Sequence, residues 1–283
     1  MALSWEMELP QELPSSVAVY QLAPPRASQE NAVAQARRLG LRGDAQDFQI
    51  AGDWISYQEG TQQVSLHGRS GALYYRNREK YGVAREDREF EIPDENAEGI
   101  ARQFAADADL VPDDEDARLE KVSHLRSAGR SMEGEEQQET TIDAGVLFRR
   151  VVEDIPVAGP GGELMVNVDP DAEVVGTQRV WRGKERRLRE VSVRPREHAL
   201  WAIETLAENI RGDVTVRQAA LAYFEFGPLD RQSHLEPAFV FVYDVTDGEV
   251  GFRAAELVPA GEQIFGALKG QKRFPGERRP RPH

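Results

Sequence analysis

The order of elements along the chain constrains the fold more than any other feature of the sequence. Three helix-like segments begin at Ser28, Pro93 and Arg194, and strand-like segments follow each of them. The helices also start alike, with the triplets Glu30-Asn31-Ala32, Glu95-Asn96-Ala97 and Glu197-His198-Ala199. Long antiparallel hairpins with one covering helix are typical of α+β layers rather than of a doubly wound parallel sheet. We therefore expect an α+β protein built from repeated modules, each a helix plus an antiparallel β-sheet.

The helix-like segments carry the signals that start and end helices. Ser28 and Asp94 are good N-cap residues, and Pro195 suits a first helical turn. Gly40 is a suitable C-terminal stop for the first helix. Apolar residues then recur at helical spacing in the second and third segments: Ala97, Ile100, Ala101, Phe104 and Ala108, and Ala199, Ala202, Ile203, Leu206 and Ile210.

The strand-like segments complete each module and set its limits. Leu164, Val166 and Val168 alternate onto one face of a strand, and the apolar run 238–245 predicts a central strand covered on both faces. Asp247-Gly248 is a hairpin turn signal. We expect the following domains: a first helix-sheet module over 1–92, a second over 93–185 with a solvated acidic loop at 128–139, a third over 186–266, and a basic flexible tail over 267–283.

The composition narrows the function classes. The formal net charge of −14 disfavours nucleic-acid binding, and the absence of cysteine excludes disulfides, thiolate nucleophiles and cysteine-ligated metal sites. The start of the chain, MALSWEMELP, does not read as a signal peptide, and no run approaches the roughly 18 apolar residues of a membrane span. We expect a cytoplasmic protein that contacts neither nucleic acid nor membrane.

Familiar catalytic and metal motifs are absent from the sequence. The chain has no HExxH and no GxSxG, and the run Gly159 to Gly162 precedes a strand-like segment, so it predicts a hairpin turn rather than a phosphate loop. Asp169, Asp171 and Glu173 resemble a loose calcium loop, but turn chemistry explains them better. His198 beside Glu197 could act as an acid or base, although such a residue usually packs at a helix start. We expect no catalytic residue, no metal and no cofactor. The sequence leaves open whether the protein is an enzyme and favours the reading that it is not.

Aromatic residues on the strands, with arginines near them, suggest peptide capture. An exposed sheet edge offers backbone hydrogen bonds, and aromatic pockets give selectivity. The expected peptide-binding residues are Tyr75, Arg149, Trp181, Arg182, Tyr223 and Phe226. The alternative for each aromatic residue is a place in the core.

The stretch from Phe148 to Arg182 resembles the PepSY-type modules of bacterial protease propeptides and related regulators. The matching elements are Arg149-Arg150, Ile155-Pro156-Val157, the glycine turn 159–162, the apolar strand 164–168 and the acidic turn 169–171. The resemblance implies PepSY-like or cystatin-like layers and a non-catalytic module that binds or inhibits peptides and proteins.

The chain as a whole also looks like the peptide-binding proteins that assist maturation of ribosomally made peptide natural products, such as those of crocagin biosynthesis. That resemblance implies capture of a precursor peptide by β-strand addition and aromatic pockets. Two alternatives stay open: a regulatory or inhibitory module that binds a folded protein such as a protease, and an enzyme of unfamiliar type that assists peptide cyclisation. The partner is thus a peptide or a protein, and a homodimer is compatible with the sequence.

Overall fold

The computed structural model describes residues 2–25, 28–83, 89–112, 116–127, 139–248, 251–266 and 268. The described helices are α1 (Gln29–Arg38), α2 (Asp94–Asp107) and α3 (Arg196–Asn209), with a short 3₁₀ turn at Ala45–Asp47. The strands of the N-terminal part are β1 (Leu3–Trp5), β2 (Ser16–Leu22), β3 (Gln49–Ala51), β4 (Trp54–Glu59), β5 (Gln62–His67), β6 (Leu73–Asn77) and β7 (Asp116–Ser127). The later strands are β8 (Thr140–Val152), β9 (Ile155–Ala158), β10 (Glu163–Val168), β11 (Val174–Val180), β12 (Lys184–Ser192), β13 (Asp213–Phe224), β14 (His234–Thr246) and β15 (Gly251–Pro259).

All of these strands join one mixed sheet of 15 strands. Its main path runs β12-β2-β14-β13-β9-β8-β10-β11-β6-β5-β4-β3, and β1, β15 and β7 pair with β13, β14 and β8 respectively. The expected fold class of repeated helix-plus-sheet modules, and with it the α+β description, is therefore wrong. The helices are only three in the described chain, and strands pair across the expected modules: β6 pairs with β11, β9 with β13, and β2 with both β12 and β14.

The physical reason is that an open strand edge at the end of one segment is available for backbone pairing with a segment far along the chain. A separate module ends with unpaired N–H and C=O groups at its outer strand, and pairing with the next segment satisfies them. Strand β9 is the link, since it pairs antiparallel with β8 and parallel with β13. The sheet therefore passes without a break from a first half, made of β3 to β8, β10 and β11, to a second half, made of β1, β2 and β12 to β15.

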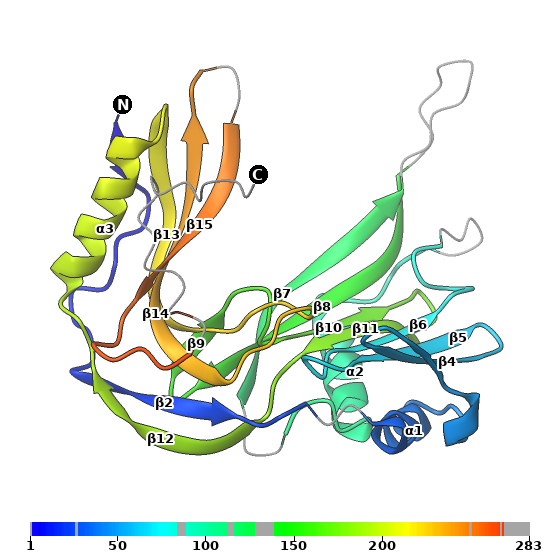
Figure 1. Cartoon of the computed structure of the whole chain (residues 1–283). Coiled ribbons are helices and arrows are strands. Elements are labelled where there is room, and N and C mark those ends of the chain that lie inside the picture. The colour runs from blue at the N-terminus through cyan, green and yellow to red at the C-terminus, as the bar shows by residue number, and fades with distance from the viewer. Residues whose placement is uncertain are drawn as a thin grey trace, which may run out of the picture.

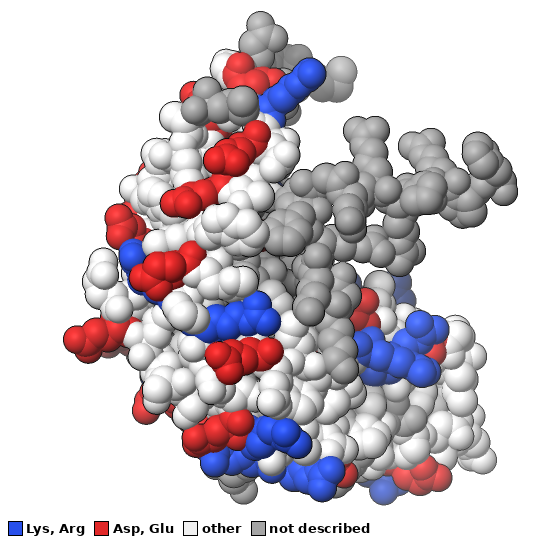
Figure 2. All heavy atoms as spheres, turned by 60° about the vertical axis from the view of Figure 1, so that its left-hand side comes forward, with Lys and Arg blue, Asp and Glu red and all other residues white. Residues whose placement is uncertain are grey.

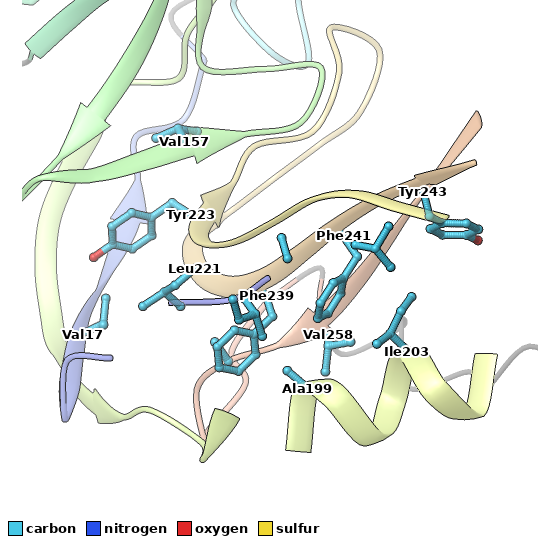
Figure 3. Packing of buried hydrophobic residues seen from close by; sticks show 14 of the residues in the cluster. Val17, Val157, Ala199, Ile203, Leu221, Tyr223, Phe239, Phe241, Tyr243 and Val258 are labelled. Atoms are coloured by element: carbon cyan, nitrogen blue, oxygen red, sulfur yellow. The ribbon is translucent and has the colours of Figure 1, made fainter. Parts of the chain in front are cut away.

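Two hydrophobic cores lie on the sheet, one in each half. In the first, α1 and α2 cover one face of β4, β5, β8, β10 and β11, as Figure 1 shows. In the second, α3 packs on the outer face of β13, β14 and β15. Figure 3 shows Ala199 and Ile203 of α3 directed toward Phe239, Phe241 and Val258. Each half is therefore a two-layer structure whose sheet has one face covered by helices.

The three helices lie close to where the sequence predicts them. Ser28 is the N-cap of α1, and its hydroxyl accepts a hydrogen bond from the Asn31 N–H at 3.2 Å. For α2 and α3 the N-cap positions are Pro93 and Pro195, so Asp94 is the first helical residue rather than the cap. Gly40 follows the end of α1 with φ = +85°, the left-handed conformation that glycine adopts freely.

The sequence predicts that both faces of β14 are covered, but the structure covers only one of them along much of the strand. Its residues alternate beyond Phe239: Phe241 and Tyr243 are buried toward α3, whereas Val240, Val242 and Asp244 are only half-buried on the other face. None of the described helices covers that other face. The apolar run alone could not reveal this, because valine is common on half-covered strands as well as in cores.

The surface carries both charge signs close together. On the face seen in Figure 2, acidic and basic side chains of the described residues lie interspersed rather than in single-sign patches. Within the described residues, no helix is both long and apolar enough to cross a membrane. The expected acidic loop at 128–139 and the tail at 267–283 fall outside the described residues, except for Glu139 and Leu268.

Candidate functional site

A buried group of three charges lies where the two halves meet. The Glu225 carboxylate, which follows β13, accepts hydrogen bonds from Arg150 Nη1 of β8 at 3.0 Å and from the Arg182 N–H and Nη1 at 2.9 and 3.2 Å. The side chains of Arg150 and Glu225 are 0% exposed and that of Arg182 is 2% exposed. Arg182 also donates to the carbonyl oxygens of Phe226, Gly227 and Asp230, each at 2.7 Å. We call these three residues the junction triad.

The glycine run that the sequence predicts as a turn packs directly on the junction triad. The Gly161 N–H donates to the Glu225 carbonyl oxygen at 3.0 Å. A Cβ at Gly161 would lie 2.4 Å from the Phe226 carbonyl oxygen and 2.7 Å from Glu225 Cγ, distances that real atoms do not tolerate. The glycines therefore allow two chain segments to approach closely.

The junction triad is a structural element. Its carboxylate and guanidinium groups bind one another and the surrounding carbonyls, although the Nε atom of Arg182 has no hydrogen-bond partner among the described residues. Burial keeps the three side chains from contact with a ligand. A buried guanidinium without a carboxylate partner is costly, so the triad ties β8, the end of β11 and the end of β13 together. We assign it the role of fixing how the two halves join.

Most of the residues expected to bind peptide lie inside the protein. Tyr75, Trp181, Arg182 and Tyr223 are all less than about 7% exposed, and Tyr223 donates its hydroxyl proton to the Ala18 carbonyl oxygen at 2.8 Å. Arg149 and Phe226 are half-buried. Arg149 donates to Glu120 at 2.7 Å and to the Gly159 carbonyl oxygen at 3.0 Å, and Phe226 lies against Phe224 with ring centroids 5.0 Å apart. The structure brings Arg182 and Phe226 together at the junction and places Tyr75 in the other core.

The acidic turn and the helix histidine have internal partners. Lys80 Nζ lies 2.6 Å from Glu173, 3.3 Å from Asp169 and 3.7 Å from Asp171, so a lysine supplies the cation at the loop that resembles a calcium site. Burial and the nearby Arg194 guanidinium lower the pKa of His198, whose Nε2 lies 2.9 Å from Arg194 Nη1. No group of three or more metal-ligating side chains occurs among the described residues.

One face of the first half offers polar and aromatic side chains without a helix over them. Because side chains alternate across a strand, the residues of β4, β5, β6 and β11 that point away from α1 and α2 form rows across the sheet. The register places Ser56 opposite Ser65, Ser65 opposite Tyr74, and Tyr74 opposite Gln178. A neighbouring row places Gln63 opposite Arg76 and Arg76 opposite Gly176. We call this surface the open face.

A hollow of about 320 Å³ lies in the open face. It is lined by Trp54, Ser56, Gln63, Ser65, Tyr74 and Arg76. The Trp54 ring lies edge-on to Tyr74, with centroids 5.4 Å apart, and 4.6 Å from the buried His67 ring. Ser56 and Ser65 share a hydrogen bond of 2.8 Å across the strands. The hollow therefore has an aromatic wall and a hydrophilic floor.

Several polar groups of the open face are available to a ligand. Within the described part of the chain, the side chains of Gln63, Tyr74 and Gln178 make no hydrogen bond, and Arg76 makes no ion pair. Burial raises the pKa of Tyr74, and the positive charge of Arg76 opposes that rise. The Tyr74 hydroxyl thus stays protonated near neutral pH and can donate or accept a hydrogen bond.

The Arg76 guanidinium is held in place by an aromatic ring. It lies over the Tyr81 ring, 4.9 Å from the centroid. The Tyr81 ring in turn lies on Gly176 of β11, where a Cβ would come within 2.5 Å of ring carbon Cδ2. Glycine at this position leaves room for the ring beside the strand. The stack leaves the planar edge of the guanidinium, which carries its N–H donors, free to bind an anion.

The peptide-binding residues expected from the sequence include Tyr75, but not Trp54 or Tyr74, which line this hollow. Trp54 lies on β4 and both tyrosines lie on β6, with β5 between these strands. Alternation puts Tyr74 and Tyr75 on opposite faces of the sheet. Of the two tyrosines, Tyr74 lies on the open face. The Tyr75 ring lies on the other face, with its centroid 6.3 Å from that of Phe104 of α2. The usable signal was the alternation of serine and glutamine with apolar residues in β4 and β5.

A larger hollow, of about 460 Å³, lies at the start of α2. Its walls include Glu89, Glu91, Asn96, Ile100 and Pro170. Acidic residues near a helix N-terminus complement the helix dipole without any ligand. None of the described residues that line this hollow is aromatic, so it is a weaker candidate for recognition than the hollow of the open face.

Three strands of nine or more residues, β7, β12 and β15, leave an edge unpaired within the described residues, and β12 pairs only with β2. Strand β7 pairs only with β8, and β15 pairs only with β14. Strand β7 alternates charged residues such as Arg118, Glu120 and Lys121, which discourage pairing with another chain. Strand β15 has fewer charges and exposes Phe252.

Comparison with known proteins gives a likeness of fold alone. No family model matches the sequence, and no curated protein matches it. A solved structure of an uncharacterized protein from Eubacterium rectale ATCC 33656 is similar, with a TM-score of 0.58 and 12% identity over 92% of this chain and 89% of that chain. The Bacillus megaterium YpeB C-terminal domain aligns with a TM-score of 0.30 and 14% identity over 85% of this chain and 97% of that chain, which is too low to carry an argument. The chain thus shares the fold of the first protein over most of its length.

Proposed function

We propose that this protein binds an extended peptide segment on the open face, with the hollow at Trp54 and Tyr74 as its side-chain pocket. The observation that carries the proposal is the combination of an aromatic wall with polar side chains that have no partner in the described chain. Pockets that recognise ligands are concave and combine apolar walls with a few polar groups that fix orientation.

The kind of peptide that we propose comes from the resemblance of the sequence to peptide-binding proteins that assist maturation of ribosomally made peptide natural products. A precursor peptide undergoing maturation, in the cytoplasm, is the partner that we propose. A segment of a folded protein, such as a protease, is the alternative and would use the same pocket.

A selection of random peptides displayed on phage against the full chain tests the proposal. The double variant Trp54→Ala/Tyr74→Ala removes the aromatic wall, and we expect binding of the selected peptides to fall roughly 30-fold or more, since truncating a central aromatic anchor costs about 2 kcal/mol. The matched control is Trp201→Ala/Leu229→Ala, which removes an aromatic and an apolar side chain that are 52% and 62% exposed elsewhere.

Circular dichroism verifies that both double variants fold. Selected peptides that bind the wild type and the control equally well, but not the Trp54/Tyr74 variant, support the proposal. Failure to enrich any peptide, or equal binding to all three proteins, would contradict it.

A further inference from the structure

We infer that the hollow selects a peptide in which a carboxylate side chain and an aromatic side chain are two residues apart. The inference rests on the proposed peptide-binding function and names the chemistry of the peptide. Three observations carry it: the unpaired guanidinium of Arg76, its fixed position, and its distance from the aromatic wall.

The first observation is charge. Arg76 is exposed and contacts no carboxylate among the described residues, although the chain has a net charge of −14. Other arginines at the surface of the same half have acidic partners, such as Arg102 with Glu98 at 2.7 Å and Arg69 with Asp53 at 2.7 Å. A guanidinium binds a carboxylate through two parallel hydrogen bonds, so an acidic side chain complements Arg76.

The second observation is preorganisation. Gly176 seats the Tyr81 ring, and the ring supports the guanidinium from one side. A long arginine side chain that is already held in position loses less conformational entropy on binding than a free one. The stack also leaves the hydrogen-bonding edge of the guanidinium accessible.

The third observation is spacing. Arg76 and Tyr74 are two residues apart on β6 and therefore lie on the same face, roughly 7 Å from each other along the strand. Trp54 extends the aromatic wall beside Tyr74. An extended peptide lying along β6 presents alternate side chains to the sheet at the same interval. An acidic residue over Arg76 thus places the residue two positions away over the Trp54 and Tyr74 rings.

Three arrays of short synthetic peptides test this inference by fluorescence polarisation, with fixed cores Asp-x-Phe, Asn-x-Phe and Asp-x-x-Phe in random flanks. We expect the Asp-x-Phe array to bind the wild type best, by about tenfold or more over Asn-x-Phe, as for a hydrogen-bonded charge. Arg76→Gln should remove this preference, and Arg76→Lys should restore only part of it, because lysine keeps the charge but loses the planar edge.

The matched control is Arg186→Gln on β12, an exposed arginine whose replacement makes the same change of net charge in the other half. It should bind the peptides as the wild type does. Equal binding of the Asp-x-Phe and Asn-x-Phe arrays, an unchanged preference in Arg76→Gln, or equal binding of the Asp-x-x-Phe array would overturn the inference while leaving peptide binding intact. Absence of binding by every array would overturn the proposed function as well.

Discussion

Replacement of Glu225 by glutamine tests the role of the junction triad. The change keeps the size of the side chain but removes the negative charge that faces Arg150 and Arg182, both buried. It also turns an amide N–H₂ group toward a guanidinium, donor against donor. Removing one member of a buried ion pair costs about 3–5 kcal/mol. An unfolding entropy of about 0.6 kcal/mol per kelvin for 283 residues converts this loss into a melting temperature lower by about 5–8 °C.

Thermal unfolding followed by circular dichroism measures this shift. The control is Glu8→Gln, which removes the same charge from an exposed carboxylate that pairs with Arg196 at 3.0 Å. Such surface pairs contribute about 0–1 kcal/mol, so the control should melt within about 2 °C of the wild type. A melting temperature for Glu225→Gln that is equally close to the wild type would refute the assignment of the triad as the element that fixes the junction.

Four further substitutions test the packing and the electrostatics. Gly161→Ala should destabilise the protein because the new Cβ has no room beside Phe226. Gly99→Ala, at an open position within α2, should instead stabilise the protein by about 0.5–1 kcal/mol. Urea unfolding measures both changes in the free energy of unfolding. Burial raises the pKa of Asp143, so ionisation of its carboxyl opposes folding at neutral pH. Asp143→Asn should therefore raise the melting temperature at neutral pH. The difference in melting temperature between variant and wild type should shrink as the pH falls and the wild-type carboxyl takes up its proton. The opposite trend would contradict this. Lys80→Met leaves the buried Asp169 without its cation and should lower the melting temperature, while an unchanged value would show that the acidic turn does not need the lysine.

Local signals in the sequence identify the elements, because the forces that start helices and alternate side chains act over a few residues. Ser28 caps α1 as expected, and Leu164, Val166 and Val168 share the buried face of β10. The assembly of those elements depends on partners far apart in the chain. Strand β2 pairs with strands more than 160 residues away, and nothing within its own seven residues specifies them.

The candidate site was harder to predict for the same reason. Glutamate is almost never fully buried unless paired, so the sequence gives no reason to place Glu225 inside the core until Arg150, 75 residues earlier, is known to lie beside it. Similarly, the alternation of Tyr74 and Tyr75 says that they face opposite ways but not which of the two faces the helices cover. The positions of α1 and α2 decide that Tyr74 is the accessible one.

Photo-crosslinking tests the central claim most directly. A selected peptide that carries a photoreactive phenylalanine analogue at its aromatic position is irradiated with the full chain, and mass spectrometry locates the adducts. The account predicts adducts on the open face, at Trp54, Gln63 or Tyr74. Adducts confined to α3, or to residues outside β4, β5, β6 and β11, would contradict the claim that this face is where the protein binds.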